Sequence, residues 1–206
     1  MFSSWVILTS VNTKFVSLFM NWQNSFLKCC PELVSRVYVF CEDNTVEHHL
    51  KAISSFKFVT RGDTSKSYSL DFGDVEYRQL VTKRPIHILS FLKKGNNVFY
   101  TDIDTVFLSN PFKYIHKFKE DVLVSVDMES WRKWTPYYCT GIMSIRSNIK
   151  TIILLQKWHN LTLNPRYKHY MNQPLFNIAL RHSNTTVRAL EKRYFPPGSV
   201  LKKGLL

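Results

Sequence analysis

Apolar and polar positions follow two rhythms along this chain, which together predict a sheet covered by helices. Short apolar runs rich in β-branched and aromatic residues are typical of buried strands. The predicted strands are residues 5–8, 37–41, 56–59, 98–101, 122–126, 141–145 and 187–190. Segments with apolar residues three or four positions apart predict helices near 13–30, 43–51, 75–94, 148–162 and 172–182. Strands that alternate with helices indicate an α/β fold with a largely parallel sheet, in one domain.

Individual side chains of these helices can be assigned to a buried face. Apolar residues three or four positions apart lie on one side of a helix, which is expected to face the sheet. The residues expected to be buried in the first and fourth helices are Phe15, Leu18, Phe19, Trp22, Phe26, Ile149, Ile152, Ile153 and Trp158. In the 75–94 segment, Pro85 is expected to break or kink the helix and Gly95 to cap its end. The polar stretch 61–74 is expected to be a loop.

The composition of the 206 residues is that of a folded domain with a basic surface. Apolar residues make up 45% of the chain and aromatic residues 15%, which is too hydrophobic for a disordered chain. The formal charge of 28 − 15 = +13 should attract anions such as nucleic acid, anionic lipid or phosphorylated small molecules. The basic residues are scattered, so most of this charge is interpreted as a solvated face. A nucleic-acid-binding module is an alternative, but the chain has no recognisable motif for it.

Cysteine spacing and the N-terminal segment indicate no further site or targeting signal. The four cysteines include no CxxC pair, which argues against a zinc site or a disulfide framework. The first 15 residues lack the basic segment and the cleavage site of a signal peptide. No apolar stretch is long enough to span a membrane. The N-terminal apolar patch is therefore interpreted as a strand.

Two acids directly follow a predicted strand in the stretch NNVFYTDIDTVFLSNPF, residues 96–112. Residues i and i+2 of an extended chain point to the same side, so Asp102 and Asp104 can converge. Ligands of open α/β sheets bind beyond the carboxyl ends of the strands, which is where the strand at 98–101 delivers this pair. Mg²⁺ or Mn²⁺ commonly binds one or two carboxylates together with substrate phosphates. The pair therefore predicts a metal site that binds a nucleotide diphosphate.

Two other interpretations of the acid pair stay open at this point. In the first, one carboxylate caps the turn and the other is solvated. In the second, the letters D-x-D-x-[TV] begin a haloacid-dehalogenase phosphatase motif with Asp102 as the nucleophile. That motif normally opens its fold, whereas here it lies near the middle of the chain. It also requires a paired-acid metal site further on, and no such pair follows Asp104.

Several segments, in order, resemble the nucleotide-diphospho-sugar transferase domain of glycosyltransferase family 77. The segment 83–112 resembles the core of that family, with a Lys-bearing helix, a Gly turn, a strand and the D-x-D. The other matching segments are Asn21-Trp22, TGIMSIRSN (140–148), NQPLFN (172–177) and FPPG (195–198). The resemblance covers nearly the whole chain and implies a GT-A fold, a Rossmann-like, mixed and mostly parallel sheet flanked by helices.

The resemblance implies a retaining transferase that moves a xylose- or galactose-type sugar from a UDP-sugar to a hydroxyl of a glycan or glycoprotein. It implies Mn²⁺, or Mg²⁺, held by Asp102 and Asp104. The other residues implied in donor binding are Ile103, Lys83 and Gly141. The residues implied in catalysis are Gln173, Asn172 and Asp127. Two plainer interpretations remain, with Lys83 a solvated lysine and Asp127 a turn acid at the end of a strand.

The chain departs from the family pattern at three places. Asn172 stands where the family has an acid, and an amide cannot act as a carboxylate nucleophile. Cys139 stands where the family has Asn, and no His follows the FPPG turn before Leu206. The departures leave room for a front-face mechanism, in which the departing phosphate deprotonates the acceptor. They also favour an alternative function, a catalytically weak or inactive homologue that binds a nucleotide sugar.

The surroundings of the enzyme follow from the resemblance alone. It implies a Golgi lumen and a type II membrane anchor, so the domain over 1–206 is expected to lack its N-terminal anchor and its C-terminal end. Trp131 and Trp134 are expected either to stack on sugar rings or to pack within a loop. No nucleic-acid partner is implied.

Overall fold

The computed structural model describes residues 4–60, 78, 80–127 and 136–196. The strands described are β1 (Trp5–Val11), β2 (Val37–Cys41), β3 (Lys57–Thr60), β4 (Asn97–Thr101), β5 (Val122–Val126), β6 (Tyr138–Ile145) and β7 (Val187–Ala189). The α-helices are α1 (Val16–Cys29), α2 (Asn44–Lys51), α4 (Arg84–Leu92), α5 (Phe112–Ile115), α6 (Ile149–Leu163) and α7 (Asn172–Arg181). Short 3-10 helices are η1 (Thr13–Phe15), η2 (Pro31–Arg36) and η3 (Pro165–Tyr167). A strand forms at each position where the apolar pattern predicts one.

The strands form one sheet in the order β3-β2-β1-β4-β6-β5-β7. β3, β2, β1 and β4 are parallel, and β7 is parallel to β5, whereas β6 is antiparallel to both of its neighbours. Because β6 runs backwards, Tyr138 lies opposite Val126 and Ile142 lies opposite Thr101. The start of β6 therefore meets the carboxyl ends of β4 and β5 at one edge. The prediction of a mixed, mostly parallel sheet flanked by helices is confirmed.

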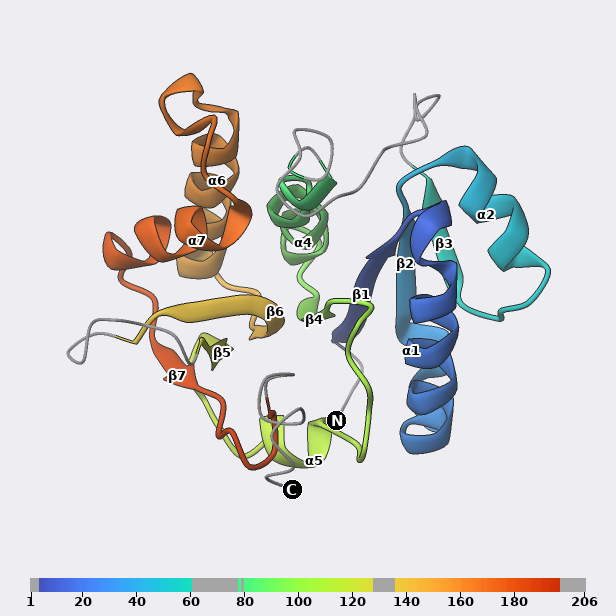
Figure 1. Ribbon diagram of the computed structural model, residues 1–206. Helices are drawn as coiled ribbons and strands as arrows, with labels where there is room; N and C mark the ends of the chain where they lie inside the picture. Colours follow the sequence, from blue (N-terminus) through green and yellow to red (C-terminus); the bar gives the residue numbers. More distant parts are fainter. Residues whose placement is uncertain (1–3, 61–77, 79, 128–135, 197–206) are drawn as a thin grey trace.

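Helices cover both faces of the sheet (Figure 1). Side chains alternate between the two faces along a strand. Ile7 and Val39 belong to a core that also contains residues of α1, α2 and α5. Leu8 and Phe40, one position further along the same strands, belong to a second core with α4, α6 and α7. Because of this alternation, the position of a residue along its strand determines which helices its side chain can contact at the sheet edge.

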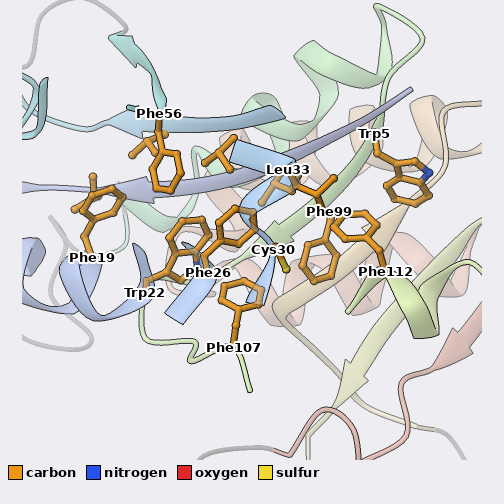
Figure 2. Close-up of a cluster of buried hydrophobic side chains, with 14 of the residues drawn as sticks. Trp5, Phe19, Trp22, Phe26, Cys30, Leu33, Phe56, Phe99, Phe107 and Phe112 are labelled. Atoms are coloured by element: carbon orange, nitrogen blue, oxygen red, sulfur yellow. The ribbon is translucent and has the colours of Figure 1, made fainter. Parts of the chain in front are cut away.

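An aromatic cluster packs α1 against the sheet. Trp22 stacks on Phe26 with ring centroids 5.2 Å apart and ring planes 1° apart. Phe56 and Phe107 approach both rings edge-on, from opposite sides of the pair in Figure 2. The indole N–H of Trp22 donates to the hydroxyl of Thr101 at 2.8 Å. Since Thr101 is the last residue of β4, this bond anchors the strand end that carries the acid pair.

Replacing Trp22 with Phe should lower the free energy of unfolding by about 2 kcal/mol. The variant loses ring volume at a fully buried position and leaves the Thr101 hydroxyl without its donor. Urea unfolding followed by circular dichroism measures the change. Leu18→Gln, at a side chain of α1 that is 39% exposed, is the control and should change stability by no more than about 0.5 kcal/mol. Equal losses in the two variants would contradict this packing.

The predicted buried faces are wrong at three positions. Leu18 is 39% exposed, Ile149 is 69% exposed and Ile153 is 58% exposed. The buried residues of α6 are Thr151, Leu154, Leu155 and Trp158. Thr151 faces inward because its hydroxyl and backbone N–H form a capping box with Asn148, which sets the rotation of the helix. The run of isoleucines does not reveal this rotation, because apolar residues are available on several sides of α6.

The expected break before Pro85 is confirmed. Helical residues up to position 81 are followed by a turn at Thr82 and Lys83, and α4 then begins at Arg84 with Pro85 in its first turn. Gly95 follows the helix with a φ of +79°, and its N–H donates to the carbonyl of Leu92. None of the described helices combines the length and the apolar character of a membrane span.

Candidate functional site

Asp102 lies on the face of the sheet that α4 covers. It is the first residue after β4, two and four positions beyond Tyr100 and Val98, which belong to the core on that face. Its N–H donates to the carbonyl of Gly141 at 2.8 Å, so the pairing with β6 extends one residue past the strand. Its own carbonyl accepts from the N–H of Thr105 at 3.1 Å. The chain therefore turns at once, which leaves the carboxylate at the rim of the sheet.

One oxygen of the Asp102 carboxylate is held by two donors. Its Oδ1 accepts from the guanidinium of Arg84 and, at 3.0 Å, from the hydroxyl of Tyr100. Burial raises the pKa of Asp102, Arg84 acts in the opposite direction, and Asp104 raises it further. Burial also raises the pKa of Tyr100, so its hydroxyl keeps its proton at neutral pH. These contacts fix the carboxylate while 34% of the side chain stays exposed.

Arg84 is a site residue that the sequence interpretation missed. The side chain is 8% exposed and donates to the carbonyl and the hydroxyl of Thr140 at 2.9 and 2.8 Å. Its guanidinium also lies 4.7 Å from the ring centroid of Tyr100. Although burial disfavours the charge, the Asp102 carboxylate holds the pKa of Arg84 above its usual value. The sequence signal for it is a single Arg at the start of a helix, RPIHILSFL, that is otherwise mainly apolar.

The second oxygen of Asp102 lies close to a glycine of β6. The register between β5 and β6 shifts between Val124 and Ser125, an irregularity of the kind that often lies next to active sites. Gly141 lies in the shifted part of β6, and a Cβ there would lie 3.0 Å from Oδ2 of Asp102. The same Cβ would lie 3.6 Å from Sγ of Cys139, whose pKa is raised by burial. The absence of a side chain at Gly141 therefore lets the Asp102 carboxylate lie against the backbone of β6.

The oxygen donors at this position fit a hard divalent cation. No group of three or more His, Cys, Asp and Glu side chains suited to a metal occurs within the described residues. Two carboxylates suffice where substrate phosphates complete the coordination. Oδ2 of Asp102 lies beside Gly141 on a side chain that is 34% exposed, and Asp104 is exposed. Ile103, between them, packs against the core on the α1 side.

A second pair of predicted residues meets at the end of β5. The side-chain amide of Gln173, in the first turn of α7, donates to Oδ2 of Asp127 at 2.9 Å. Asn177 accepts from the N–H of Tyr138 at 2.9 Å and donates to the carbonyls of Tyr138 and Gln173 at 2.8 and 2.9 Å. Asn177, which the sequence interpretation did not assign to the site, therefore locks α7 onto the start of β6. The structure brings Asp127 and Gln173 together as side chains of one edge.

The two remaining predicted residues form contacts with other parts of the protein. Asn172 is 6% exposed, and its amide donates to the carbonyl of Val81 at 3.2 Å. Lys83 forms an ion pair with the buried Glu42, with 3.1 Å between Nζ and Oε2. Trp131 and Trp134 lie outside the described residues.

Two hollows lie elsewhere on the molecule. One of about 360 Å³ is lined by Ile153, Gln156, Lys157, Asn160, Leu161 and Asn164. The other, of about 300 Å³, is lined by Trp5, Val6, Ser35, Arg36, Tyr38, Lys57 and Asn96. Neither includes a residue of the acid pair or of the Gln173 contact, so neither is assigned to this site.

Comparison with known sequences relates the chain to sugar transferases. The family described as nucleotide-diphospho-sugar transferase matches residues 32–204. A UDP-D-xylose:L-fucose alpha-1,3-D-xylosyltransferase, MGP4, of Arabidopsis thaliana is 30% identical over 64% of the chain and 41% of its own length. A UDP-galactose:fucoside alpha-3-galactosyltransferase of Dictyostelium discoideum is 28% identical over 78% of the chain and 28% of its own length. The chain thus spans less than half of each of these two relatives.

Solved structures share the fold at low sequence identity. The glycosyltransferase GlyE of Streptococcus pneumoniae has a TM-score of 0.62 at 12% identity, covering 97% of the chain and 48% of that protein. The galactosyltransferase LgtC, solved with donor and acceptor sugar analogues, has a TM-score of 0.58 at 14% identity, covering 91% and 73%. Mouse xyloside xylosyltransferase 1 has a TM-score of 0.58 at 11% identity, covering 91% and 85%. The expected GT-A fold is confirmed by these likenesses.

Proposed function

This chain belongs to the nucleotide-diphospho-sugar transferase family, and we propose that it transfers a sugar from a UDP-sugar to a hydroxyl of a glycan or glycoprotein with retention of configuration. The observation that carries the proposal is the Asp102 carboxylate. Arg84 and Tyr100 hold one of its oxygens, the other lies beside the backbone of Gly141, and 34% of the side chain is exposed. Such an oxygen at the carboxyl edge of the sheet suits a cation-bound diphosphate. The names of the relatives support xylose or galactose as the sugar.

In this proposal Asp102 and Asp104 would hold Mn²⁺ or Mg²⁺. When bound, the cation neutralises the diphosphate and favours its departure as the leaving group. Ile103 would contact the nucleotide, whereas the ammonium group of Lys83 pairs with Glu42. Gly141, which has no side chain, would let the diphosphate approach the backbone of β6 closely.

The sugar would lie against Gln173 and Asp127. The hydrogen bond between these side chains fixes the Gln173 amide, which we propose contacts the donor sugar while Asp127 lines its pocket. Asn172 has no nucleophilic carboxylate, so a covalent glycosyl intermediate at that position is chemically excluded. We propose a front-face reaction in which the bond from the acceptor oxygen to the anomeric carbon forms as the bond to the β-phosphate oxygen breaks. The acceptor proton passes to the departing phosphate. Asn172 would hold the start of α7 through its hydrogen bond to Val81.

The cellular setting stays a proposal. We propose that the full protein acts in the Golgi lumen behind an N-terminal membrane anchor, and that residues 1–206 form one transferase domain of a longer chain. The proposed donor carries phosphate groups, so the +13 charge is accounted for by attraction of an anionic small molecule. Nucleic-acid binding is therefore not proposed.

The proposed transfer predicts that UDP release depends on the divalent cation. With Mn²⁺, the protein should release UDP from UDP-xylose or UDP-galactose faster than from other UDP-sugars, and addition of a fucoside acceptor should raise the rate. Removal of the cation with EDTA should return the rate to the protein-free baseline, and fresh Mn²⁺ should restore it. Luminescent detection of UDP measures each rate. A rate that survives EDTA would contradict the metal site, and no release from any sugar would contradict transfer.

Asn172 also supports a second candidate, a homologue that binds a nucleotide sugar without turnover. This candidate predicts that UDP with Mn²⁺ raises the melting temperature, because ligand that binds only the folded state stabilises it. It predicts no UDP release, even from a longer chain that includes any native C-terminal segment. Measurable turnover would exclude it.

A further inference from the structure

Glu42 and Asp102 are acids at equivalent positions of two strands. Each is the first residue after its strand, Glu42 after β2 and Asp102 after β4. Each lies two positions beyond a residue of the core that contains α4, Phe40 in β2 and Tyr100 in β4. The sheet order places β1 between the two strands, so the acids flank β1 on the face that α4 covers. Parallel strands lie about 4.8 Å apart, which separates the acids by roughly 10 Å across the sheet.

The carboxylate of Glu42 is buried and faces two basic groups of α4 and the turn before it. The residue is 3% exposed. Its Oε2 lies 3.1 Å from Nζ of Lys83, and its Oε1 lies 3.6 Å from Nδ1 of His87. His87 is itself 3% exposed and stacks on Phe40, with ring centroids 3.8 Å apart and planes 3° apart. A carboxylate this deeply buried is stable only with such partners, so the contact fixes where α4 begins.

The first turn of α4 therefore connects the two acids. Lys83 and Arg84 are consecutive residues, and they reach to opposite sides of β1, Lys83 to Glu42 and Arg84 to Asp102. Neighbouring residues of a helical turn point about 100° apart, so both contacts form together only when the turn has one position and one rotation. The carboxylate of Glu42 thus restricts the placement of the Arg84 guanidinium.

We propose that Glu42 is a positioning residue for the Asp102 carboxylate, acting through the turn that carries Lys83 and Arg84. The inference rests on the proposed function, because it assigns Glu42 to the donor site without a contact to the donor. In dinucleotide-binding α/β folds, an acid after the second strand binds the ribose. Here the corresponding carboxylate is turned under α4, which favours a role in orienting the basic turn. Asp43, the next residue, caps α2 and accepts from Thr13, so it is not part of this arrangement.

The test compares UDP binding in single and double variants by calorimetry with Mn²⁺ present. Glu42→Gln keeps the side-chain volume and removes the charge, and it should raise the Kd for UDP by about tenfold, the size of effect seen when a partner that orients a metal ligand is removed. Arg84→Lys should also raise the Kd. If Glu42 acts through Arg84, the double variant should bind no more weakly than Arg84→Lys alone. Glu47→Gln is the matched control, because Glu47 lies on α2 and pairs with Lys51, and its Kd should equal the wild-type value.

Three results would overturn the inference. The first is an unchanged Kd in Glu42→Gln together with a lowered melting temperature, which would indicate a purely structural acid. The second is that the effects of Glu42→Gln and Arg84→Lys multiply in the double variant. If Glu42→Gln does not fold, Lys83→Met replaces it in the same double-variant comparison, because the Lys83 side chain is 36% exposed. The third result is that the effects of Lys83→Met and Arg84→Lys on the Kd multiply in their double variant.

Failure of the proposed function gives a different result. In that case the wild-type chain binds no UDP with Mn²⁺ and releases none from any UDP-sugar. The connection between the acids is then measured in urea unfolding, with Glu42→Gln and Asp102→Asn alone and combined. Non-additive losses of stability would support the connection through α4, and additive losses would overturn it.

Discussion

Asp102→Asn should lower kcat/KM for the donor by about 100-fold or more and also destabilise the folded protein. The substitution removes one of the two negative charges proposed to hold the cation. It also leaves the guanidinium of Arg84, which is 8% exposed, without its carboxylate partner. Loss of one partner from a buried ion pair costs several kcal/mol, and partial exposure of Asp102 reduces this to about 2 kcal/mol. Initial rates of UDP release and urea unfolding measure the two effects.

Asp104→Asn separates the two effects of the acid pair. Asp104 is exposed, so its replacement should lower activity to a similar extent while stability changes by no more than about 0.5 kcal/mol. Full activity in either variant would contradict the proposed metal site. Equal destabilisation in both variants would contradict the conclusion that Arg84 forms its ion pair with Asp102 and not with Asp104.

The direction in which pH changes the contribution of Asp102 to folding stability follows from its pKa. Burial raises the pKa of Asp102 above its value in the unfolded chain. A carboxyl with a raised pKa binds protons more tightly in the folded state, so this group favours folding most at pH values below its unfolded pKa. Its contribution is lost as the pH rises through the folded pKa. Bound cation favours the ionised carboxylate, which opposes this trend when donor is present.

Much of the fold follows from the sequence because buried strands leave a strong local signal. β2 and β5 coincide with their predicted ranges, since each is a mainly apolar run, interrupted in β5 only by Ser125, between polar residues. β1 extends to Val11, beyond the predicted end at residue 8, because Thr9 is polar but fully buried in the sheet. Hydropathy assigns Thr9 to a surface, whereas pairing with β2 supplies the hydrogen bonds of its backbone. Strand ends are therefore less predictable than strand centres.

The candidate site likewise contains residues that the sequence predicts and residues that it does not. The acids Asp102 and Asp104 could be predicted because they follow a strand at a fixed spacing. Arg84 and Glu42 could not, because periodicity assigns charged residues to solvent and each is buried by a partner distant in sequence. The ion pair between Lys83 and Glu42 depends on the order of strands in the sheet, which no local pattern encodes.

Gly141→Ala should lower donor turnover by about 100-fold, with a loss of stability no larger than that of Asp102→Asn. The added Cβ would lie 3.0 Å from Oδ2 of Asp102, closer than a carbon and a carboxylate oxygen normally approach. Because Arg84 and Tyr100 hold Oδ1, the carboxylate cannot rotate away without losing those hydrogen bonds. The oxygen proposed to hold the cation is therefore displaced or covered. Rates of UDP release at saturating donor, with the unfolding free energy measured in parallel, check this result.

Gly95→Ala is the matched control, since it adds the same methyl group at a position where the only cost is backbone strain. Gly95 has a φ of +79°, and nothing lies within 4 Å of a Cβ built there. The variant should lose about 1 kcal/mol of stability through backbone strain and retain its kcat. The two alanine variants are therefore distinguished by turnover, which is lost at residue 141 and retained at residue 95. Unchanged turnover in Gly141→Ala would show that the space beside Asp102 is not where the diphosphate and its cation bind.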